Sequence, residues 1–297
     1  MNKRIRLLLK NWLPPIIHEK LCGYRAWLKF LMYEKKRVLK KNSVFENTAR
    51  GKRAFLIATG PSLKMDDLSA LAGEDCYGIS NFFLHEHIQS VNPKFHFFVP
   101  YHAPVTIESY LEWLMEADKS LPPETNIFMG HSAYELVNKF NLFRGRKIFY
   151  LYMSGYHAGD GVDITKPVLA PQTGPIMALP VLLYMGYSEI YLLGCDHTVM
   201  RDYKKTVQNF YDPSLDIRRT IPAGKTTGYD VWYDGIVSNL SNTLGVFEQY
   251  VLFKKIFLDR NVRIINLSQD SWLDLFEIDT LKNVVDKIPR KSDDKAL

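Results

Sequence analysis

A glycine-containing turn follows the first strongly apolar run of the chain. Thr59, Gly60, Pro61 and Ser62 come directly after residues 54–58, which are all apolar. Gly60 would let a backbone come close to a ligand, and Ser62 with the free N–H groups of a following helix suits an anion or a phosphate. The spacing matches neither a Gly-x-Gly-x-x-Gly loop nor a Walker loop. The turn therefore predicts a ligand site without naming the ligand.

Other residues able to bind or react also follow short apolar runs. These candidates are Asn81, His102, Gly194, Asp196 and His197, together with Gln172, Thr173 and Gly174 ahead of an apolar stretch at 175–185. The carboxyl ends of parallel strands meet at one edge of a sheet, so the candidates would share a crevice there.

His197 is the first candidate for proton transfer. It follows a strand end beside Asp196, where an imidazole facing the crevice could act as a base or bind phosphate as a cation. Alternatively it only caps the strand. Asp230 and Asp234, in a loop rich in Tyr and Trp, are the alternative base, because a carboxylate closed off from water has a raised pKa.

Residues 200–219 are polar with scattered aromatic side chains, which is typical of a lid that closes over a site. Tyr203 in this stretch could contact a phosphate. The pair His85 and His87 has no third histidine nearby, so the sequence predicts no metal site.

Short β-rich runs alternate with helical stretches from residue 52 onward. The expected strands are 54–58, 77–80, 95–99, 126–129, 148–152, 190–193 and 263–267, and the expected helices are 108–116, 133–138, 175–185 and 242–258. This alternation predicts an α/β fold, Rossmann-like, with a mostly parallel sheet and helices on both faces.

The N-terminal arm differs from the rest of the chain. Residues 1–42 carry twelve Lys or Arg against two Glu, a net charge of +10, while the whole chain carries +6, so the remainder is at −4. Two amphipathic helices are expected on either side of Pro14 and Pro15. Their Trp residues and basic charge favour an anionic membrane surface, although packing on the body or on a partner subunit would give the same pattern.

The composition narrows the function classes. With 46% apolar and 24% charged residues in 297, the chain is typical of a globular protein. The acidic body argues against nucleic-acid binding. Three scattered cysteines fit a reducing compartment, and we expect neither a signal peptide nor a transmembrane helix.

Three segments together resemble a known family. The stretches LIATGPSLKMDDLSAL, GISNFF and PQTGPIMALPVLLYMGYSEIYLLGCDH are similar to the bacterial lipooligosaccharide sialyltransferases of glycosyltransferase family 42. They also resemble a wider group that includes motility-associated factors and hydroxymethylpterin pyrophosphokinases. The resemblance covers roughly residues 52–268, with a long unmatched middle.

The resemblance implies a Rossmann-like, GT-A-like variant domain with a small late lid, which transfers sialic acid from CMP-sialic acid with inversion and without a metal. The residues matching the CMP pocket are Gly60, Pro61, Ser62, Asn81, Thr173, Gly174, Gly194 and Asp196. Three departures matter. Thr59 stands where the family has asparagine, and only Tyr203 falls near a position where the family has tyrosines that bind the leaving phosphate. No histidine follows His197, so the family's catalytic histidine has no counterpart here.

These observations lead to one expectation and two rivals. We expect a basic arm at 1–50 and a nucleotide-sugar transferase domain at 51–297, with a lid around 200–240. The enzyme would lie on the cytoplasmic face of the membrane, use a CMP-sugar without a cofactor and act on a glycan or lipid-linked glycan. A homo-oligomer is compatible with this expectation. The rivals are an ATP-dependent pyrophosphokinase, with Mg²⁺ held by Asp160, Asp163 and Asp196, and a non-catalytic assembly adaptor.

Overall fold

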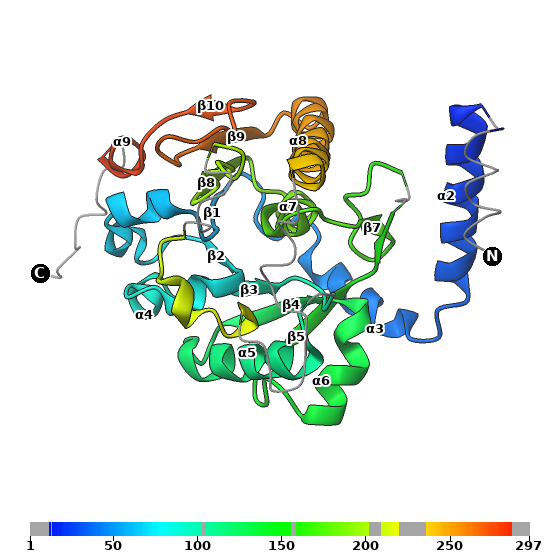
Figure 1. Ribbon diagram of the computed structural model, residues 1–297, viewed down its shortest axis with the longest axis horizontal. Helices are drawn as coiled ribbons and strands as arrows, with labels where there is room; N and C mark the ends of the chain where they lie inside the picture. Colours follow the sequence, from blue (N-terminus) through cyan, green and yellow to red (C-terminus); the bar gives the residue numbers. More distant parts are fainter. Residues whose placement is uncertain are drawn as a thin grey trace, which may run out of the picture.

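The computed structural model describes residue 12 and residues 14–102, 105–155, 159–201, 209–219 and 236–286. Its centre is an eight-stranded parallel sheet in the order β10-β9-β8-β1-β2-β3-β4-β5 (Figure 1). The strands are β1 (Arg53–Ile57), β2 (Cys76–Ile79), β3 (Phe95–Phe98), β4 (Asn126–Gly130), β5 (Ile148–Leu151), β8 (Glu189–Leu193), β9 (Arg263–Asn266) and β10 (Glu277–Ile278). The expected α/β Rossmann-like fold is confirmed.

The central strands are apolar on both faces because helices cover both sides of the sheet. Along β1, Phe55 and Ile57 point into one core, while Ala54 and Leu56 point into the other. All four side chains are fully buried. Strands buried on both sides need a continuous apolar run, and this is the signal that made them recognisable in the sequence.

Helices form a layer on each side of the sheet (Figure 1). On one side lie α7 (Gly174–Met185) and α8 (Ile236–Asp259), and on the other lie α4 (Ile88–Val91), α5 (Ile107–Ser120) and α6 (Tyr134–Phe140). Nearly every side chain of α7 is buried. A helix that is apolar all round is typical of a core position. Gly186, with a φ of 85°, ends it.

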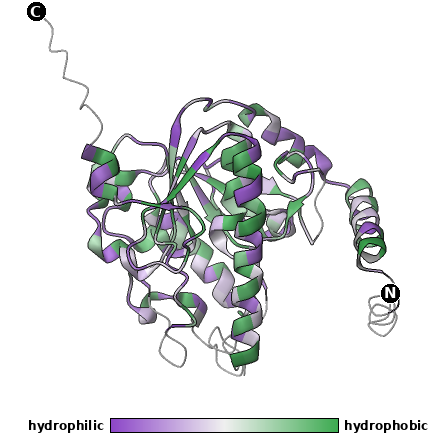
Figure 2. Ribbon diagram, turned by 90° about the horizontal axis from the view of Figure 1, so that it is seen from above, coloured by the Kyte–Doolittle hydropathy of each residue, from purple (hydrophilic) through white to green (hydrophobic). Residues whose placement is uncertain are grey.

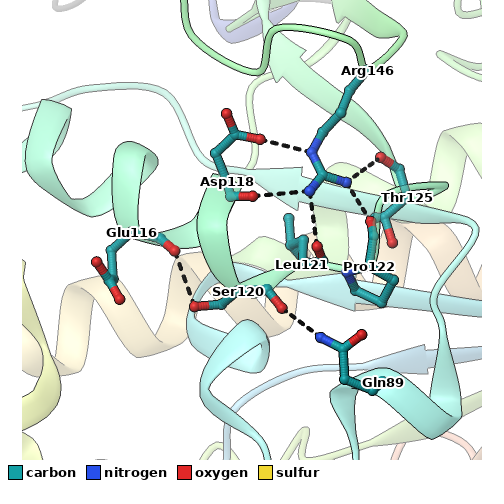
Figure 3. Close-up of polar contacts among 8 residues, drawn as sticks. All are labelled: Gln89, Glu116, Asp118, Ser120, Leu121, Pro122, Thr125 and Arg146. Atoms are coloured by element: carbon teal, nitrogen blue, oxygen red, sulfur yellow. Dashed lines mark hydrogen bonds and ion pairs between the residues drawn. The ribbon is translucent and has the colours of Figure 1, made fainter.

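Arg146 fixes the carboxyl end of α5 (Figure 3). Its guanidinium donates to Asp118 Oδ1 at 2.7 Å and to the carbonyl oxygens of Asp118 at 2.9 Å and Leu121 at 2.8 Å, and also to those of Pro122 and Thr125. These carbonyls lie at and just beyond the helix end, where intrahelical partners run out. The planar guanidinium therefore holds α5 in register, and α5 carries side chains that reach the candidate site.

The second helix expected in the arm is present as α2 (Pro15–Leu31), which begins at Pro15. Figures 1 and 2 both show α2 standing beside the body and apart from it. Its exposed apolar side chains include Ile17, Leu21, Tyr24, Leu28 and Leu31. Near its end, Phe30 is buried against Tyr152, with ring centroids 5.1 Å apart. The first expected helix lies outside the described residues, apart from Trp12.

The chain joins the body before residue 51. α3 (Lys36–Lys40) and the 3₁₀ helix η1 (Lys41–Phe45) follow α2. Asn42 is fully buried and donates to the carbonyl oxygens of Tyr150 and Ile164. Residues 36–50 thus contribute to the packed body.

Several short elements were not expected from the sequence. They are the strands β6 (Met153–Ser154) and β7 (Val168–Leu169), helix α9 (Leu281–Asp286) and the 3₁₀ helices η3 (Leu68–Leu71), η4 (Ser80–Leu84), η5 (His131–Ala133), η6 (Pro213–Leu215) and η7 (Ile217–Arg219). The helix expected after Ser62 is present as the 3₁₀ helix η2 (Pro61–Met65). Within the described residues, no helix has both the length and the apolar character needed to cross a bilayer.

Candidate functional site

The sheet order reverses beside β1. The chain builds β2 to β5 on one side of β1 and then returns to place β8 on the other side. In parallel sheets, ligands bind outside the carboxyl ends of the strands at such a reversal, and we call this region beside β1 and β8 the crevice. The predicted turn at 59–62 leaves β1 at this point, and Gly194 to Asp196 leave β8 beside it. Two of the predicted segments are therefore brought together here.

Gly60 is required for this junction. A Cβ atom at Gly60 would lie 1.7 Å from Asp196 Oδ2 and 2.6 Å from the carbonyl oxygen of Gly194. The Gly60 N–H donates to that same carbonyl at 2.8 Å. Gly194 has a φ of 64°, a region that favours glycine. The two glycines let the ends of β1 and β8 touch through their backbones.

Asp196 caps the turn after β1. Its Oδ1 accepts from the Ser62 N–H at 3.0 Å, and its Oδ2 accepts from Ser62 Oγ at 2.9 Å. Burial raises the pKa of Asp196, although the two bonds from Ser62 favour its ionised form. The donors of Ser62 that the sequence assigned to a phosphate are thus engaged by a carboxylate of the protein. Ser62 and Asp196 shape the floor of the crevice.

Asp66 is a second carboxylate beside this floor, and the sequence analysis did not single it out. Its Oδ2 atom is buried without a hydrogen-bond partner among the described residues. Burial, and then repulsion from Asp196, raise the pKa of Asp66 to about 6. The carboxyl of Asp66 would therefore change its protonation state near pH 6, in the range where a general acid or base works.

Replacing Asp66 with Asn is expected to stabilise the protein above pH 6. Its folded-state pKa lies above its ordinary value of 3.8. The folded state therefore holds the proton more tightly, and stability falls as pH rises from about 4 to about 6. The gain for Asp66→Asn at pH 7.5 is about 1 to 2 kcal/mol, after a discount for partial exposure. Urea unfolding at pH 5 and pH 7.5 measures it.

Asp67→Asn is the matched control, because Asp67 is exposed and accepts from Ser69. The explanation fails if both variants show the same pH dependence of stability, or if Asp66→Asn is destabilised at pH 7.5.

Asn81 lies at the end of β2 and is fully buried. Its Oδ1 accepts from the indole N–H of Trp113 on α5. Beyond it, Arg218 packs over the Trp113 ring at 4.4 Å and donates to Ser80 Oγ at 3.2 Å. Arg218 also forms two hydrogen bonds of 2.9 Å with Asp216. Two sequence-distant segments therefore meet around Trp113.

The longest described stretch of the predicted lid, residues 209–219, crosses the carboxyl ends of β1 and β2. The Phe210 N–H donates to the Thr59 carbonyl at 3.2 Å. Asp216 and Arg218 are 2% and 8% exposed, so this pair is buried rather than solvated. Burial alone would raise the pKa of Asp216, yet Arg218 and the Asn81 amide hold it below its ordinary value. The segment thus walls the crevice on the α5 side.

The amino end of α7 walls the crevice on the other side. A Cβ atom at Gly174 would lie 2.4 Å from Ile79 Cγ2, at the end of β2, so glycine allows this close approach. Thr173 occupies the N-cap position, but its side chain accepts no capping bond, and the first turn carries no acidic residue. The first N–H groups of a helix carry partial positive charge and suit an anion.

The loop into α7 is held by α8. Gln249 accepts from the Gln172 N–H at 2.8 Å and donates to the Ala170 carbonyl at 2.9 Å. The Gln172 side chain itself is exposed. A single amide on α8 therefore sets the position of the loop that carries Thr173.

The His197 ring lies against α8. Its Nε2 is 2.9 Å from the buried Tyr250 hydroxyl, and the Phe247 ring lies 6.0 Å away. Burial lowers the pKa of His197 to about 4, so the imidazole is neutral at pH 7 and cannot bind phosphate as a cation there. His102 is exposed after β3. Tyr203, Asp230 and Asp234 lie outside the described residues, so their roles stay predictions.

The acidic and histidine side chains do not gather into a metal site within the described residues. A cavity of about 670 Å³ lies at the opposite edge of the sheet, around the amino ends of β1, β8 and β9. Its charged lining is largely paired internally, as in Arg53 with Glu74 and Arg263 with Glu189. It offers little unpaired charge to a nucleotide.

Comparisons with known proteins give the following. No protein-family model matches the chain, and no curated protein matches its sequence. The sialyltransferase CstII from Campylobacter jejuni, in complex with cytidine-5′-monophosphate, is a similar solved structure at 14% identity and a TM-score of 0.43, covering 77% of this chain and 85% of that one.

Two further solved structures are similar. CST-II with a trisaccharide acceptor and CMP has 14% identity and a TM-score of 0.42, covering 76% of this chain and 86% of that one. The monofunctional α-2,3-sialyltransferase Cst-I from Campylobacter jejuni has 18% identity and a TM-score of 0.42, covering 77% and 80%. These are sialyltransferases, as in the family that the sequence motifs resemble. Likenesses this distant do not assign an activity to the chain.

Proposed function

We propose that the protein is a metal-independent, inverting glycosyltransferase that uses a CMP-linked sugar. The observation that carries the proposal is the junction of the Gly60–Ser62 turn with Asp196 at the reversal of the sheet order. The turn, Asn81, the Thr173-Gly174 helix start and the Gly194-to-Asp196 segment occur in the order of the sialyltransferase motifs. The contacts that support the proposal are those of Ser62 with Asp196, of Gly174 with Ile79 and of Trp113 with Asn81.

The nucleotide would lie between the two walls. Its phosphate would face the N–H groups at the start of α7, beside Thr173, because the Ser62 donors are already taken by Asp196. Asn81 would not contact the nucleotide directly. It would position the segment that carries Asp216 and Arg218, next to the nucleotide. The transferred sugar would be sialic acid or another acidic sugar of that kind, or Kdo.

The acceptor would be a glycan of a surface polysaccharide or lipooligosaccharide. Inverting transfer needs a base for the acceptor hydroxyl and charge stabilisation for the departing phosphate. A neutral His197 bonded to Tyr250 is a weak base. We therefore propose Asp230 or Asp234 as the general base. Tyr203 would bind the departing phosphate, and all three residues would belong to a lid around 200–240.

We further propose that residues 1–42 dock the enzyme on the cytoplasmic face of the membrane, next to a lipid-linked acceptor. The exposed apolar side chains of α2 and the charge of the arm support this. Flotation with vesicles of anionic and of neutral lipid tests it, and equal binding to both, or to neither, would contradict it.

The pyrophosphokinase alternative finds no support in the described carboxylates. Asp160 pairs with Arg260 and Asp163 pairs with Lys166 at 2.8 Å. Both are therefore engaged at the protein surface and do not join Asp196 in a metal-binding group within the described part of the chain.

A thermal-shift screen against CMP, CDP, UDP, GDP and ATP, each with and without Mg²⁺, tests the nucleotide. A ligand at a hundredfold over its dissociation constant adds about 2.7 kcal/mol to the folded state. We expect a selective response to CMP that does not depend on the metal. A thermal shift with ATP only in the presence of Mg²⁺ would overturn the proposal. No shift with any of the five nucleotides would favour the non-catalytic assembly adaptor.

A further inference from the structure

Helix α8 carries an exposed apolar stripe along its outer face. Leu244, Val251 and Leu258 recur every seven residues, and they are 60%, 54% and 72% exposed. Val237 continues the same spacing toward the start of the helix and is 74% exposed. Residues seven apart lie almost above one another on a helix. Large apolar side chains aligned in this way are typical of a face that packs against another helix.

The opposite face of α8 is fixed to the body. Tyr250, Phe253 and Phe257 are buried in the core that α8 shares with α7. Figure 2 looks onto the outer side of α8, which lies across the body with apolar residues interspersed among polar ones. The stripe is therefore presented by a helix that cannot turn to hide it.

Charged residues beside the stripe indicate which kind of surface it can bind. Glu248 and Lys255 are seven residues apart, each four residues after a stripe residue, so they share one heptad position on the same flank of the stripe. Both are exposed, and neither has an ion-pair partner within the described residues. A face that offers one acidic and one basic group at this spacing is complementary to itself when it is reversed.

We infer that α8 pairs in antiparallel fashion with α8 of a second copy of this chain. A twofold axis between Val251 and Leu252 places Glu248 opposite the partner's Lys255 and Leu244 within one residue of the partner's Leu258. Symmetry then repeats both contacts, as in any isologous interface. A parallel pair would not bring these opposite charges together, so the charges select the antiparallel arrangement.

The same charges distinguish this face from the lipid-facing arm. The arm has a large excess of basic residues, whereas the flank of the α8 stripe that carries Lys255 also carries the acidic Glu248, and Lys254 lies on the other flank. An anionic bilayer attracts an excess of Lys and Arg and gains nothing from an acidic group. A second copy satisfies both charges.

The pairing would also support the candidate site. Gln249, on the side of α8 turned toward the body, holds the loop that leads to Thr173. A helix clamped by a second copy keeps this amide in place. The interface itself does not depend on which nucleotide the crevice binds.

Charge exchange on the full chain tests the inference by sedimentation velocity. The protein is expected to sediment at about twice its chain mass of 34.4 kDa. Glu248→Lys and Lys255→Glu each place like charges together twice, and each is expected to raise the dimer dissociation constant about tenfold or more. The double variant Glu248→Lys/Lys255→Glu restores opposite charges and is expected to return the dimer.

Lys282→Glu is the control, because Lys282 is exposed on α9 and makes the same charge change as Lys255→Glu. All these positions are exposed, so the thermal midpoints should match that of the unmodified protein at concentrations where all the proteins are monomeric. A monomer up to about 100 µM, unchanged mass in both single variants, or a double variant that stays monomeric would overturn the inference. So would a Val251→Glu variant that loses vesicle binding while its mass stays unchanged.

Discussion

Gly60→Ala is expected to abolish nucleotide binding and to lower the free energy of unfolding by about 3 kcal/mol. The added Cβ would lie 1.7 Å from Asp196 Oδ2 and 2.6 Å from the Gly194 carbonyl. One of these neighbours is backbone, and the other is held by two bonds from Ser62. The turn must therefore move away from β8, which breaks the floor of the crevice. Urea unfolding and nucleotide titration measure the two losses.

Gly155→Ala is the matched control, because among the described residues no atom beyond its chain neighbours lies within 4 Å of its added Cβ. It is expected to leave both stability and binding near those of the unmodified protein. A Gly60→Ala variant that binds CMP as tightly as the unmodified chain would show that the crevice does not depend on this junction.

Arg218→Ala is expected to cost about 3 to 5 kcal/mol of stability, as removal of one member of a buried ion pair does. Asp216 is 2% exposed and would lose its guanidinium partner. The substitution also uncovers the Trp113 ring and removes the bond to Ser80 Oγ. Since Ser80 precedes Asn81, we expect weaker nucleotide binding as well.

Two further variants separate the effect of the Arg218 charge from that of its hydrogen-bond geometry. Arg218→Lys keeps the charge but not the two parallel bonds to Asp216, so it should recover only part of the stability. Asp216→Asn/Arg218→Met removes both charges and is expected to be more stable than Arg218→Ala. If nucleotide affinity is unchanged at a temperature where Arg218→Ala remains folded, the pair is structural and does not position the site.

The central strands could be predicted from the sequence because each is buried on both faces and must be an apolar run. The same logic located α7, whose twelve residues are nearly all buried. It could not locate β10, whose two residues are exposed at the sheet edge. The turn after β1 was recognised as a helix start, but η2 is a 3₁₀ helix of only five residues. Its first free N–H group, that of Ser62, donates to Asp196.

Within the candidate site, sequence reasoning could find only the residues that directly follow a strand. Gly60, Asn81 and Asp196 could be found because parallel strands place their carboxyl ends together. Asp66 could not, because its raised pKa comes from burial beside Asp196, 130 residues later in the chain. The orientation of the His197 ring depends on its contact with the hydroxyl of Tyr250 on α8. The burial of Arg218 depends on its packing against Trp113 on α5. Such contacts exist only in the packed fold, and local sequence does not encode them.

The pairing of β1 with β8 has a consequence for how the chain folds. Ser62 and Asp196 are 134 residues apart, so their contact cannot form until residue 196 has left the ribosome. Until then β1 has β2 on one side and an unpaired edge on the other, with apolar side chains such as Leu56 uncovered. Contacts this distant along the chain close slowly, and open apolar edges invite aggregation. The crevice is thus among the last features to be completed, and the half-made chain is the form most in need of a chaperone.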